Sequence, residues 1–471
     1  MQNGSSDTSS LEYLFHPKSI AIAGGAYRQL YLEALLYAGF KGRIYPLSRD
    51  AGEINGLKTY HSIKDIPDTV DYVISAIPAS ATPQLIEDCA LKGVKAIHMF
   101  TAGFSEISDK RGQKLQSEIV AIARQKGIRI IGPNCMGLYC PKTGLSFHPD
   151  VSKESGSVAF LSQSGGNAIW IIREGNTKGI NFSKVISYGN ASDLNEIDFL
   201  EYLTHDPDTE VITVYVEGVS DGPRFFKTLK EAAKVKPVIL YKGGTTDIGT
   251  RAVASHTGAL AGSERVWSAL IKQAGAIQVY GMDELLDMVL LFRYMSPPKG
   301  KATCVIGIGG GNSVYAADVC ANAGLEVPLL PPATRGKLND IYSSEAGASF
   351  RNPIDMYFDR WDLAKDTIKL VDACKEIDLI LIHLTFGWNP RYEKRIVKPY
   401  VDLCTSIRRE LTKPVAVSLQ VFGLAKYDSI TFDSEASLYD SGYPVFTSVV
   451  KAAQATNRYC NFHNRPEIKS A

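Results

Sequence analysis

Short apolar runs alternate with longer amphipathic segments along most of this chain. In the first third, the apolar runs are typical of β-strands and cover residues 19–23, 43–47, 70–77, 96–100 and 129–131. The segments between them repeat apolar positions at helical spacing and predict helices over residues 31–37, 82–91 and 110–125. Strands that are separated by helical crossovers predict a parallel, doubly wound α/β sheet.

The same alternation begins again twice. After a linker at residues 151–156, strands are expected over residues 158–161, 184–187, 211–216 and 238–241. After the Pro- and Gly-containing break at residues 296–300, they are expected over residues 303–308, 379–384, 415–419 and 445–447. We therefore expect a polar tail (1–10), an N-terminal Rossmann-like α/β domain (11–145) and two flavodoxin-like α/β domains (150–295 and 300–471). The repeat is architectural, which excludes a solenoid.

Composition narrows the class of protein. The 471 residues suit about three domains of ~150 residues each. The hydrophobic fraction of 45% can form sizeable cores, and the net charge of +1 argues against nucleic acid or an anionic membrane as the main partner. No apolar run approaches the roughly 18 residues of a membrane span, and residues 1–10 lack a signal-peptide core. The cytoplasm is the expected location.

Cysteine and histidine spacing gives no sign of a metal centre. The 8 cysteines form no CxxC pair, and Cys135 and Cys140 flank a turn at a spacing too weak for a ligand pair. The histidines other than His256 are scattered without ligand spacing. We expect free buried thiols and no bound metal.

His256 is the residue with the clearest chemical potential. It lies in the small-residue stretch Ala254-Ser255-His256-Thr257-Gly258-Ala259, where an imidazole has room to accept a phosphoryl group and to move. Upstream, the apolar run at residues 211–216 ends in Glu217, and a carboxylate there can bind the second ring nitrogen and fix its tautomer. The competing interpretations are a histidine at a helix N-terminus and a solvated loop glutamate.

Loops that follow strands are the places where open parallel sheets bind ligands. The first such loop carries Gly24, Gly25 and Arg28, which suit either a phosphate site or an ordinary strand–helix turn. Later loops supply candidate cofactor contacts at Ile77, Pro78, Ala79, Thr101, Ala102, Gly103, Asn134 and Cys135. In the second domain, the run Ser162, Gln163, Ser164, Gly165 and Gly166 opens a helix and predicts an anion site, although Ser162 equally suits a helix N-cap.

Together these motifs resemble the CoA-ligase superfamily of succinyl-CoA synthetase. The similarity is greater to the α subunit, or α part, of NDP-forming acyl-CoA synthetases (acetate–CoA ligase, ADP-forming). The segments that carry it are Tyr45-Pro46-Leu47, Ile77-Pro78-Ala79, Thr101-Ala102-Gly103-Phe104-Ser105-Glu106, Gly132-Pro133-Asn134-Cys135-Met136-Gly137, Ser162-Gln163-Ser164-Gly165 and Ser255-His256-Thr257-Gly258. Gly309-Gly310-Gly311-Asn312 and Asn352-Pro353-Ile354-Asp355 are similar to the family's ligase-type CoA domain.

The resemblance implies an enzyme and a mechanism. In this family ATP and a carboxylic acid give an acyl phosphate, CoA displaces phosphate to form the thioester, and a histidine relays the phosphoryl group between nucleotide and acid. His256 matches the phosphohistidine and Glu217 its supporting carboxylate. Residues 162–166, with Thr257 and Gly258, would bind the phosphoryl group, and the first domain would bind CoA.

Two departures from the family's pattern matter. The first loop lacks the usual Gly-Ala-Ser start and later lysine, so that Arg28 is the only cation near it in sequence. Arginine binds phosphate, so CoA binding is still expected, in an altered pose or strength. No segment resembles an ATP-grasp domain, which implies that ATP/ADP with Mg²⁺ binds to a separate β partner in a hetero-oligomer.

Two other classes of protein remain open. A non-catalytic CoA- or acyl-CoA-binding protein on the same scaffold would explain the unusual first loop, whereas the presence of both His256 and Glu217 favours the enzyme. An NAD-dependent dehydrogenase ranks below both, because the first loop lacks the three-glycine fingerprint. The sequence does not identify the acid.

Overall fold

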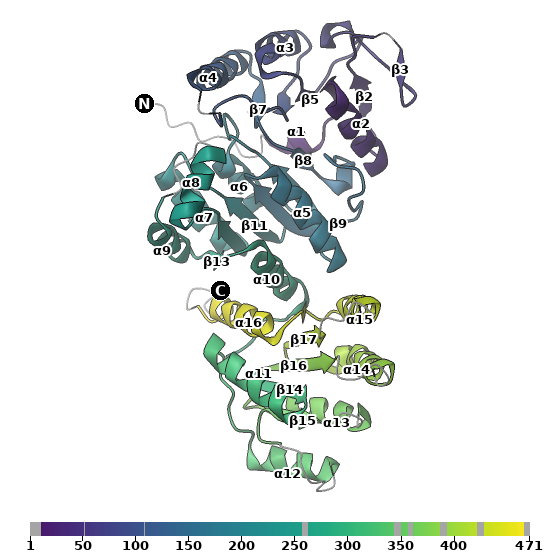
Figure 1. Ribbon diagram of the computed structural model, residues 1–471, viewed down its shortest axis with the longest axis vertical. Helices are drawn as coiled ribbons and strands as arrows, with labels where there is room; N and C mark the ends of the chain where they lie inside the picture. The colour runs from purple at the N-terminus through teal and green to yellow at the C-terminus, as the bar shows by residue number, and fades with distance from the viewer. Residues whose placement is uncertain are drawn as a thin grey trace. The chain divides into compact units, whose positions relative to one another are not determined.

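The computed structural model describes residues 11–50, 52–107, 109–256, 262–342, 350–356, 361–386, 393–421 and 428–465 (Figure 1). The chain divides into two compact units. The first contains residues 1–176 and 180–282, and the second contains residues 177–179 and 283–471.

The first unit begins with a parallel five-stranded sheet in the order β2-β1-β5-β6-β7. Its strands are β1 (Ser19–Gly24), β2 (Arg43–Pro46), β5 (Tyr72–Ala76), β6 (Ala96–Met99) and β7 (Arg129–Ile131). The helices around it are α1 (Glu12–Phe15), α2 (Ala26–Ala38), α3 (Thr82–Ala90) and α4 (Lys110–Gln125), and a small hairpin adds β3 (Glu53–Ile54) and β4 (Leu57–Lys58). Strand residues Ala21, Val73 and Ile97 are buried in one core with Ile86 of α3 and Ile119 of α4. This burial explains the continuous apolar runs in the sequence.

The second sheet of this unit has six strands in the order β13-β12-β11-β9-β10-β8. They are β8 (Gly137–Tyr139), β9 (Ser155–Ser162), β10 (Phe182–Ser187), β11 (Val211–Val216), β12 (Val238–Lys242) and β13 (Ile277–Val279). The accompanying helices are α5 (Gly165–Thr177), α6 (Glu196–His205), α7 (Gly222–Val235), α8 (Asp247–His256) and α9 (Glu264–Ala274). β8 is antiparallel to β10, with Gly137 opposite Ser187. The chain therefore enters the second sheet at Gly137, before the expected boundary at residue 145.

The second unit contains a parallel sheet in the order β15-β14-β16-β17-β18. Its strands are β14 (Thr303–Ile308), β15 (Ile354–Met356), β16 (Leu379–Phe386), β17 (Val415–Val421) and β18 (Val445–Phe446). Its helices are α10 (Met282–Tyr294), α11 (Gly310–Ala323), α12 (Pro332–Ile341), α13 (Trp361–Asp372), α14 (Glu393–Ile407), α15 (Asp428–Asp440) and α16 (Val449–His463).

The predicted α/β class with parallel-sheet domains is confirmed, and all eight cysteines are free and buried, as expected. The helix predicted over residues 31–37 is longer in the structure, where α2 begins directly after Gly25 and ends at Ala38. The sequence pattern missed β8, β13 and β15, each of which has only three residues. No helix among the described residues is long and apolar enough to cross a membrane.

Candidate active site

Loops from both sheets of the first unit meet around a cavity of about 850 Å³, which we call the inner cavity. β1, β5, β6 and β7 run parallel and end at one edge of their sheet, so the loops after them lie together. The start of α5 in the second domain completes the lining. The lining residues are Gly25, Ala26, Tyr27, Ala76, Ile77, Pro78, Phe100, Thr101, Ala102, Asn134, Cys135, Met136, Gln163, Ser164, Gly165 and Gly166. Candidate residues from five separate loops are thus brought together.

A second cavity of about 600 Å³, the outer cavity, lies beside the first and shares Gly25, Ile77 and Pro78 with it. Gly24 and Arg28 also line the outer cavity. The two cavities form neighbouring binding spaces with common walls. Their sizes are in the range of small-molecule and cofactor sites.

The two glycines after β1 have different roles. Gly24 has φ +143°, and a Cβ added there would lie 2.8 Å from the Cβ of Ala76, so only glycine fits against β5. A Cβ added to Gly25 would meet nothing within 4 Å. The backbone at Gly25 is therefore open to a ligand at the N-terminus of α2, where helix amides favour phosphate.

Arg28 is held by a hydrogen bond from its Nη1 to the backbone oxygen of Leu47, at 2.7 Å. In space, Arg28 is not the only cation near this loop, because Arg49 also lines the outer cavity. Arg49 is distant in sequence but follows β2, which runs parallel to β1 and ends at the same edge of the sheet. A search of all loops after strands, rather than of the first loop alone, would have found Arg49.

Three loops at the inner cavity are hydrogen bonded to one another. The Thr101 hydroxyl donates to the backbone oxygen of Ile77 (2.6 Å), and the backbone amide of Asn134 donates to the backbone oxygen of Thr101 (3.1 Å). Asn134 itself adopts the left-handed region, with φ 59°. Gly103 and Ala79 lie in close contact beside the lining, since a Cβ added to Gly103 would be 3.3 Å from the Cβ of Ala79.

Cys135 is a structural rather than a nucleophilic residue. Burial raises the pKa of its thiol well above its ordinary value, so it stays protonated at neutral pH. Its backbone oxygen lies 3.0 Å from Nε2 of the buried His98. Burial lowers the pKa of His98 to about 4, so the neutral ring donates to Cys135 and fixes this part of the cavity wall.

At the start of α5, the Ser162 hydroxyl is buried and bonded within its own loop, to the backbone oxygen and amide of Ser164 at 2.7 and 3.1 Å. Ser162 therefore shapes the turn, whereas Gln163, Ser164, Gly165 and Gly166 line the inner cavity. The Gln163 side-chain oxygen accepts hydrogen bonds from the backbone amides of Glu217 (2.7 Å) and Gly218 (3.3 Å). This links the loop after β9 to the loop after β11.

Glu217 is buried, only 4% exposed, although it is a charged residue directly after a strand. The Tyr215 hydroxyl donates to its Oε1 at 3.1 Å. Burial, followed by the nearby Glu217 charge, raises the pKa of Tyr215 well above its ordinary value, so the phenol remains a hydrogen-bond donor. The alternative interpretation of Glu217 as a solvated loop residue is wrong.

Lys242 is a charged residue at this edge that the sequence analysis did not identify. It pairs with Val216 across β11 and β12, is 2% exposed, and its Nζ lies 5.2 Å from the centre of the Trp267 ring. Burial lowers the pKa of Lys242 to about 8, and the Glu217 charge opposes this shift. A buried ammonium is thus retained next to Glu217 at neutral pH.

His256 is the last residue of α8, which follows β12 after the loop at residues 243–246. Its side chain, with Thr257 and Gly258, lies outside the described residues, and its contact with Glu217 stays a prediction. Among the residues that the structure does describe, no group of three or more His, Cys, Asp or Glu side chains is arranged to hold a metal ion.

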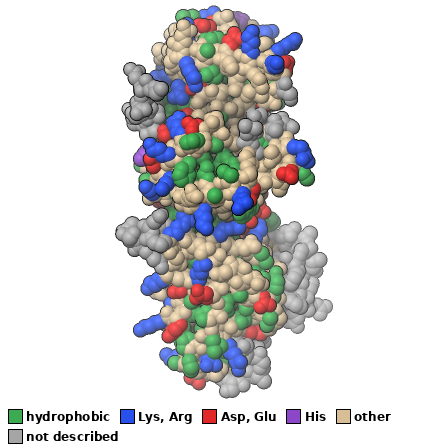
Figure 2. All heavy atoms as spheres, turned by 90° about the vertical axis from the view of Figure 1, so that its left-hand side faces the viewer, with side chains coloured by type: hydrophobic (Ala, Val, Ile, Leu, Met, Phe, Trp, Pro, Cys, Tyr) green, Lys and Arg blue, Asp and Glu red, His purple; other side chains and the backbone are tan. Residues whose placement is uncertain are grey.

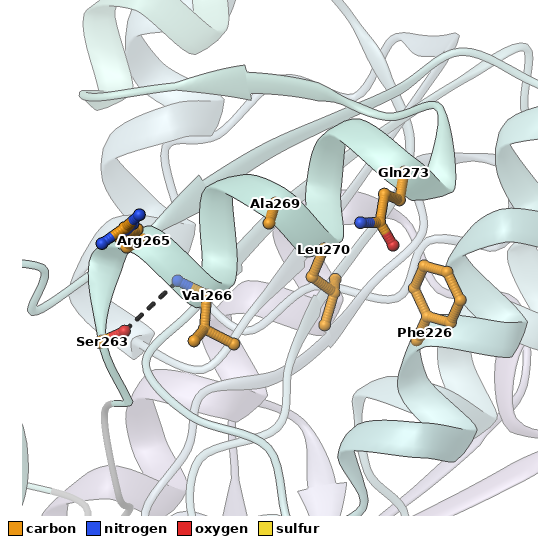
Figure 3. A pocket seen from close by; sticks show the side chains of 7 residues that line it. All are labelled: Phe226, Ser263, Arg265, Val266, Ala269, Leu270 and Gln273. Carbon is orange, nitrogen blue, oxygen red and sulfur yellow. Dashed lines mark hydrogen bonds between the residues drawn. The ribbon is translucent and has the colours of Figure 1, made fainter.

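A further pocket of about 500 Å³ lies between α7 and α9 and contains none of the candidate residues. Phe226 of α7 lies beside Leu270 and Gln273 of α9, and at the other end of the pocket the Ser263 hydroxyl accepts from the Val266 backbone amide at 3.3 Å (Figure 3). Figure 2 shows hydrophobic side chains gathered on the face that carries these two helices, where Val266 is 64% exposed.

Comparison with known proteins agrees with this architecture. Residues 18–141 match the family described as a CoA binding domain, and residues 155–292 match the succinyl-CoA ligase like flavodoxin domain. The chain is 38% identical to the acetate–CoA ligase [ADP-forming] I subunit alpha of Pyrococcus furiosus, over 74% of this chain and 76% of that protein. It is 34% identical to acetate–CoA ligase [ADP-forming] I of Archaeoglobus fulgidus, over 80% of this chain but only 55% of that protein.

Among solved structures, the dinucleotide-forming acetyl-coenzyme A synthetase 1 of Ca. Korarchaeum cryptofilum, in complex with phosphate and ADP, superposes with a TM-score of 0.82. The match has 28% identity and covers 98% of both chains. A CoA-binding domain followed by a succinyl-CoA ligase-like flavodoxin domain, together with relatives named as acetate–CoA ligases, defines the class as an acid–thiol ligase. More narrowly, the chain belongs to the ADP-forming acetate–CoA ligase family of acyl-CoA synthetases.

Proposed function

We propose that this chain is the CoA-binding, phosphohistidine-bearing subunit of an ADP-forming acyl-CoA synthetase. The reaction would join a carboxylic acid to CoA while ATP is converted to ADP and phosphate. One observation carries the proposal. The buried Glu217, the start of α5 and the strand leading to α8 share one edge of the second sheet, and this edge borders the inner cavity.

CoA would occupy both cavities of the first unit. Arg28 and Arg49 in the outer cavity offer guanidinium groups for its phosphates, and the open backbone at Gly25 offers helix amides. Ile77 and Pro78, shared by the two cavities, and Phe100 suit the pantetheine arm. The thiol would then lie in the inner cavity, near Asn134 and the start of α5.

The phosphoryl group would move through His256. A neutral imidazole attacks the γ-phosphorus of ATP as ADP leaves, and Glu217 accepts a hydrogen bond from the second ring nitrogen and stabilises the positive charge on the ring. The acid's carboxylate takes this phosphoryl group, which frees the histidine and gives an acyl phosphate. The CoA thiolate attacks the acyl carbon, and phosphate leaves. Amides at the start of α5 would stabilise the phosphoryl oxygens.

ATP/ADP with Mg²⁺ would bind to a separate ATP-grasp partner, in a hetero-oligomer. Two findings support this division. The Pyrococcus furiosus relative is named as an alpha subunit. The chain spans about half the length of the Archaeoglobus fulgidus relative, at 55% of that protein, which leaves room there for a further part.

The test is phosphorylation of the chain by γ-labelled ATP in the presence of an ATP-grasp partner. We expect acid-labile, base-stable label on the wild type and none on His256→Ala. His205→Ala, at an exposed position at the end of α6, is the control and should keep its label. Label that persists on His256→Ala would refute the assignment of His256 as the phosphorylated residue.

A further inference from the structure

Glu106, in the loop between β6 and α4, organises the loop that lines one side of the inner cavity. Its Oε1 accepts hydrogen bonds from the backbone amides of Gly103 and Phe104, the latter at 3.0 Å. Thr101 and Ala102, just upstream, line the cavity. The carboxylate therefore fixes the backbone of a segment that has no regular structure of its own.

Asn190, in the loop between β10 and α6, connects this segment to the second sheet. Its side-chain amide donates to Oε2 of Glu106 and, at 3.2 Å, to the side-chain oxygen of Gln116. Its backbone amide donates to the backbone oxygen of Pro133 (3.0 Å), and its side-chain oxygen accepts from the side-chain amide of Asn134 at 3.4 Å. Asn190 thus holds two loops of the first sheet at once.

The backbones at this junction are in close contact. A Cβ added to Gly189 would lie 2.3 Å from the backbone oxygens of both Pro133 and Asn134, so only glycine permits the approach. Burial alone would raise the pKa of Glu106, but hydrogen bonds from Asn190 and from the backbone amides outweigh it and hold the pKa below its ordinary value. Glu106 is therefore a carboxylate at neutral pH, and hydrogen bonds to a charged acceptor are the stronger kind.

We propose that Glu106 and Asn190 form an inter-domain clamp, a pair of positioning residues that hold Thr101, Ala102 and Asn134 in the geometry that binds the thiol end of CoA. The clamp rests on the CoA position proposed above. The clamp acts by fixing the residues of the cavity wall, and it contacts neither the thiol of CoA nor the acyl carbon. Because a loop that is free to shift would have to be ordered on binding, pre-organisation by the clamp favours CoA binding.

The experiment is calorimetry on the full chain with two probes, CoA and adenosine 3′,5′-bisphosphate, which carries only the nucleotide end of CoA. In Glu106→Gln, the side-chain oxygen still accepts from Gly103 and Phe104, while its amide group faces the donor amide of Asn190. We expect CoA to bind about tenfold more weakly and the bisphosphate to bind as in the wild type. Asn190→Ala should give the same split with a larger loss of CoA binding, because it also removes the side-chain contacts with Gln116 and Asn134. The double variant should be no weaker than Asn190→Ala, because both changes remove the contact between Glu106 and Asn190.

Glu118→Gln, at an exposed position on α4, is the matched control and should bind both probes normally. Equal loss of both probes would mean general damage to the domain and would overturn the clamp, as would unchanged CoA binding in folded Glu106→Gln. If Glu106→Gln does not fold, Asn190→Ala decides by the same criteria. Wild type that fails to bind CoA would instead overturn the proposed function, and the clamp with it.

Discussion

At the scale of single residues, Tyr215 and Glu217 show how a strand prepares a charged group for chemistry. They are two residues apart, so their side chains lie on the same side of β11 and its extension, and the phenol donates to the carboxylate at 3.1 Å. We predict that Tyr215→Phe slows phosphorylation of the chain roughly fivefold. One hydrogen bond contributes about 1 kcal/mol, and a barrier higher by that amount lowers a rate by about this factor. Rapid-quench measurement of labelled protein checks this.

Tyr241→Phe is the control. Its ring centre lies 5.3 Å from that of Tyr215, whereas the hydroxyl that donates to Oε1 of Glu217 at 3.1 Å belongs to Tyr215. A Tyr215→Phe rate equal to that of the wild type would show that the hydroxyl does not support Glu217.

Arg28 gives a second residue-scale prediction. Arg28→Ala should weaken CoA binding, with a smaller effect on dephospho-CoA if the guanidinium serves the 3′-phosphate. Calorimetry with both ligands distinguishes this from a pyrophosphate contact, which would give equal losses. Arg49→Ala in the same cavity is the comparison, and unchanged binding in Arg28→Ala would assign Arg28 to its structural bond with Leu47.

The limits of sequence reasoning at this scale are specific. Gly24-Gly25 and residues 162–166 could be predicted as ligand-binding loops, because their glycines and serines directly follow apolar runs. Arg49 could be found only by searching the loop after β2 as well, and Asn190 could not be predicted, because it reaches its place through the packing of the second sheet against the first. Glu106 stands out in the sequence only as part of the motif at residues 101–106, because its partner Asn190 lies 84 residues away.

At the scale of elements, Lys184 on β10 is a buried charge that stabilises a strand–helix junction. Its Nζ lies 2.8 Å from Asp206, just after α6, and the two side chains are 1% and 2% exposed. Phe15 and Tyr202 also face the ammonium, with ring centres at 5.4 and 5.7 Å. We predict that Asp206→Ala lowers the free energy of unfolding by about 3–5 kcal/mol, because the buried ammonium loses its hydrogen-bonded partner and keeps only the more distant Asp208, at 3.8 Å.

Urea unfolding followed by circular dichroism measures this effect. Asp402→Ala is the control, since Asp402 pairs with the exposed Lys398 at 2.7 Å and such a pair contributes about 1 kcal/mol or less. Equal losses in the two variants would contradict the interpretation of Lys184–Asp206 as the stabilising pair.

Elements differed in how well they could be predicted. β14 occurs as expected over Thr303–Ile308, since six buried residues give a clear apolar run. β8 could not be predicted, because Gly137–Tyr139 is short and becomes a strand only by pairing with β10. Long buried strands are encoded locally, whereas short edge strands depend on their neighbours.

At the scale of the whole molecule, the final prediction concerns dependence on a partner. We expect the purified chain alone to form no acyl-CoA and no ADP from ATP, a carboxylic acid and CoA, and to do both when an ATP-grasp protein of the same organism is added. The physical reason is that the proposed chemistry needs a nucleotide held in line with His256, and the cavities at the candidate residues suit CoA and the phosphoryl relay. Coupled assay of ADP and thioester measures both products. His256→Ala with the partner present should form neither, which separates a missing relay from a missing nucleotide site. ADP and thioester formation by the wild-type chain alone, dependent on both acid and CoA, would overturn the division of labour between two subunits.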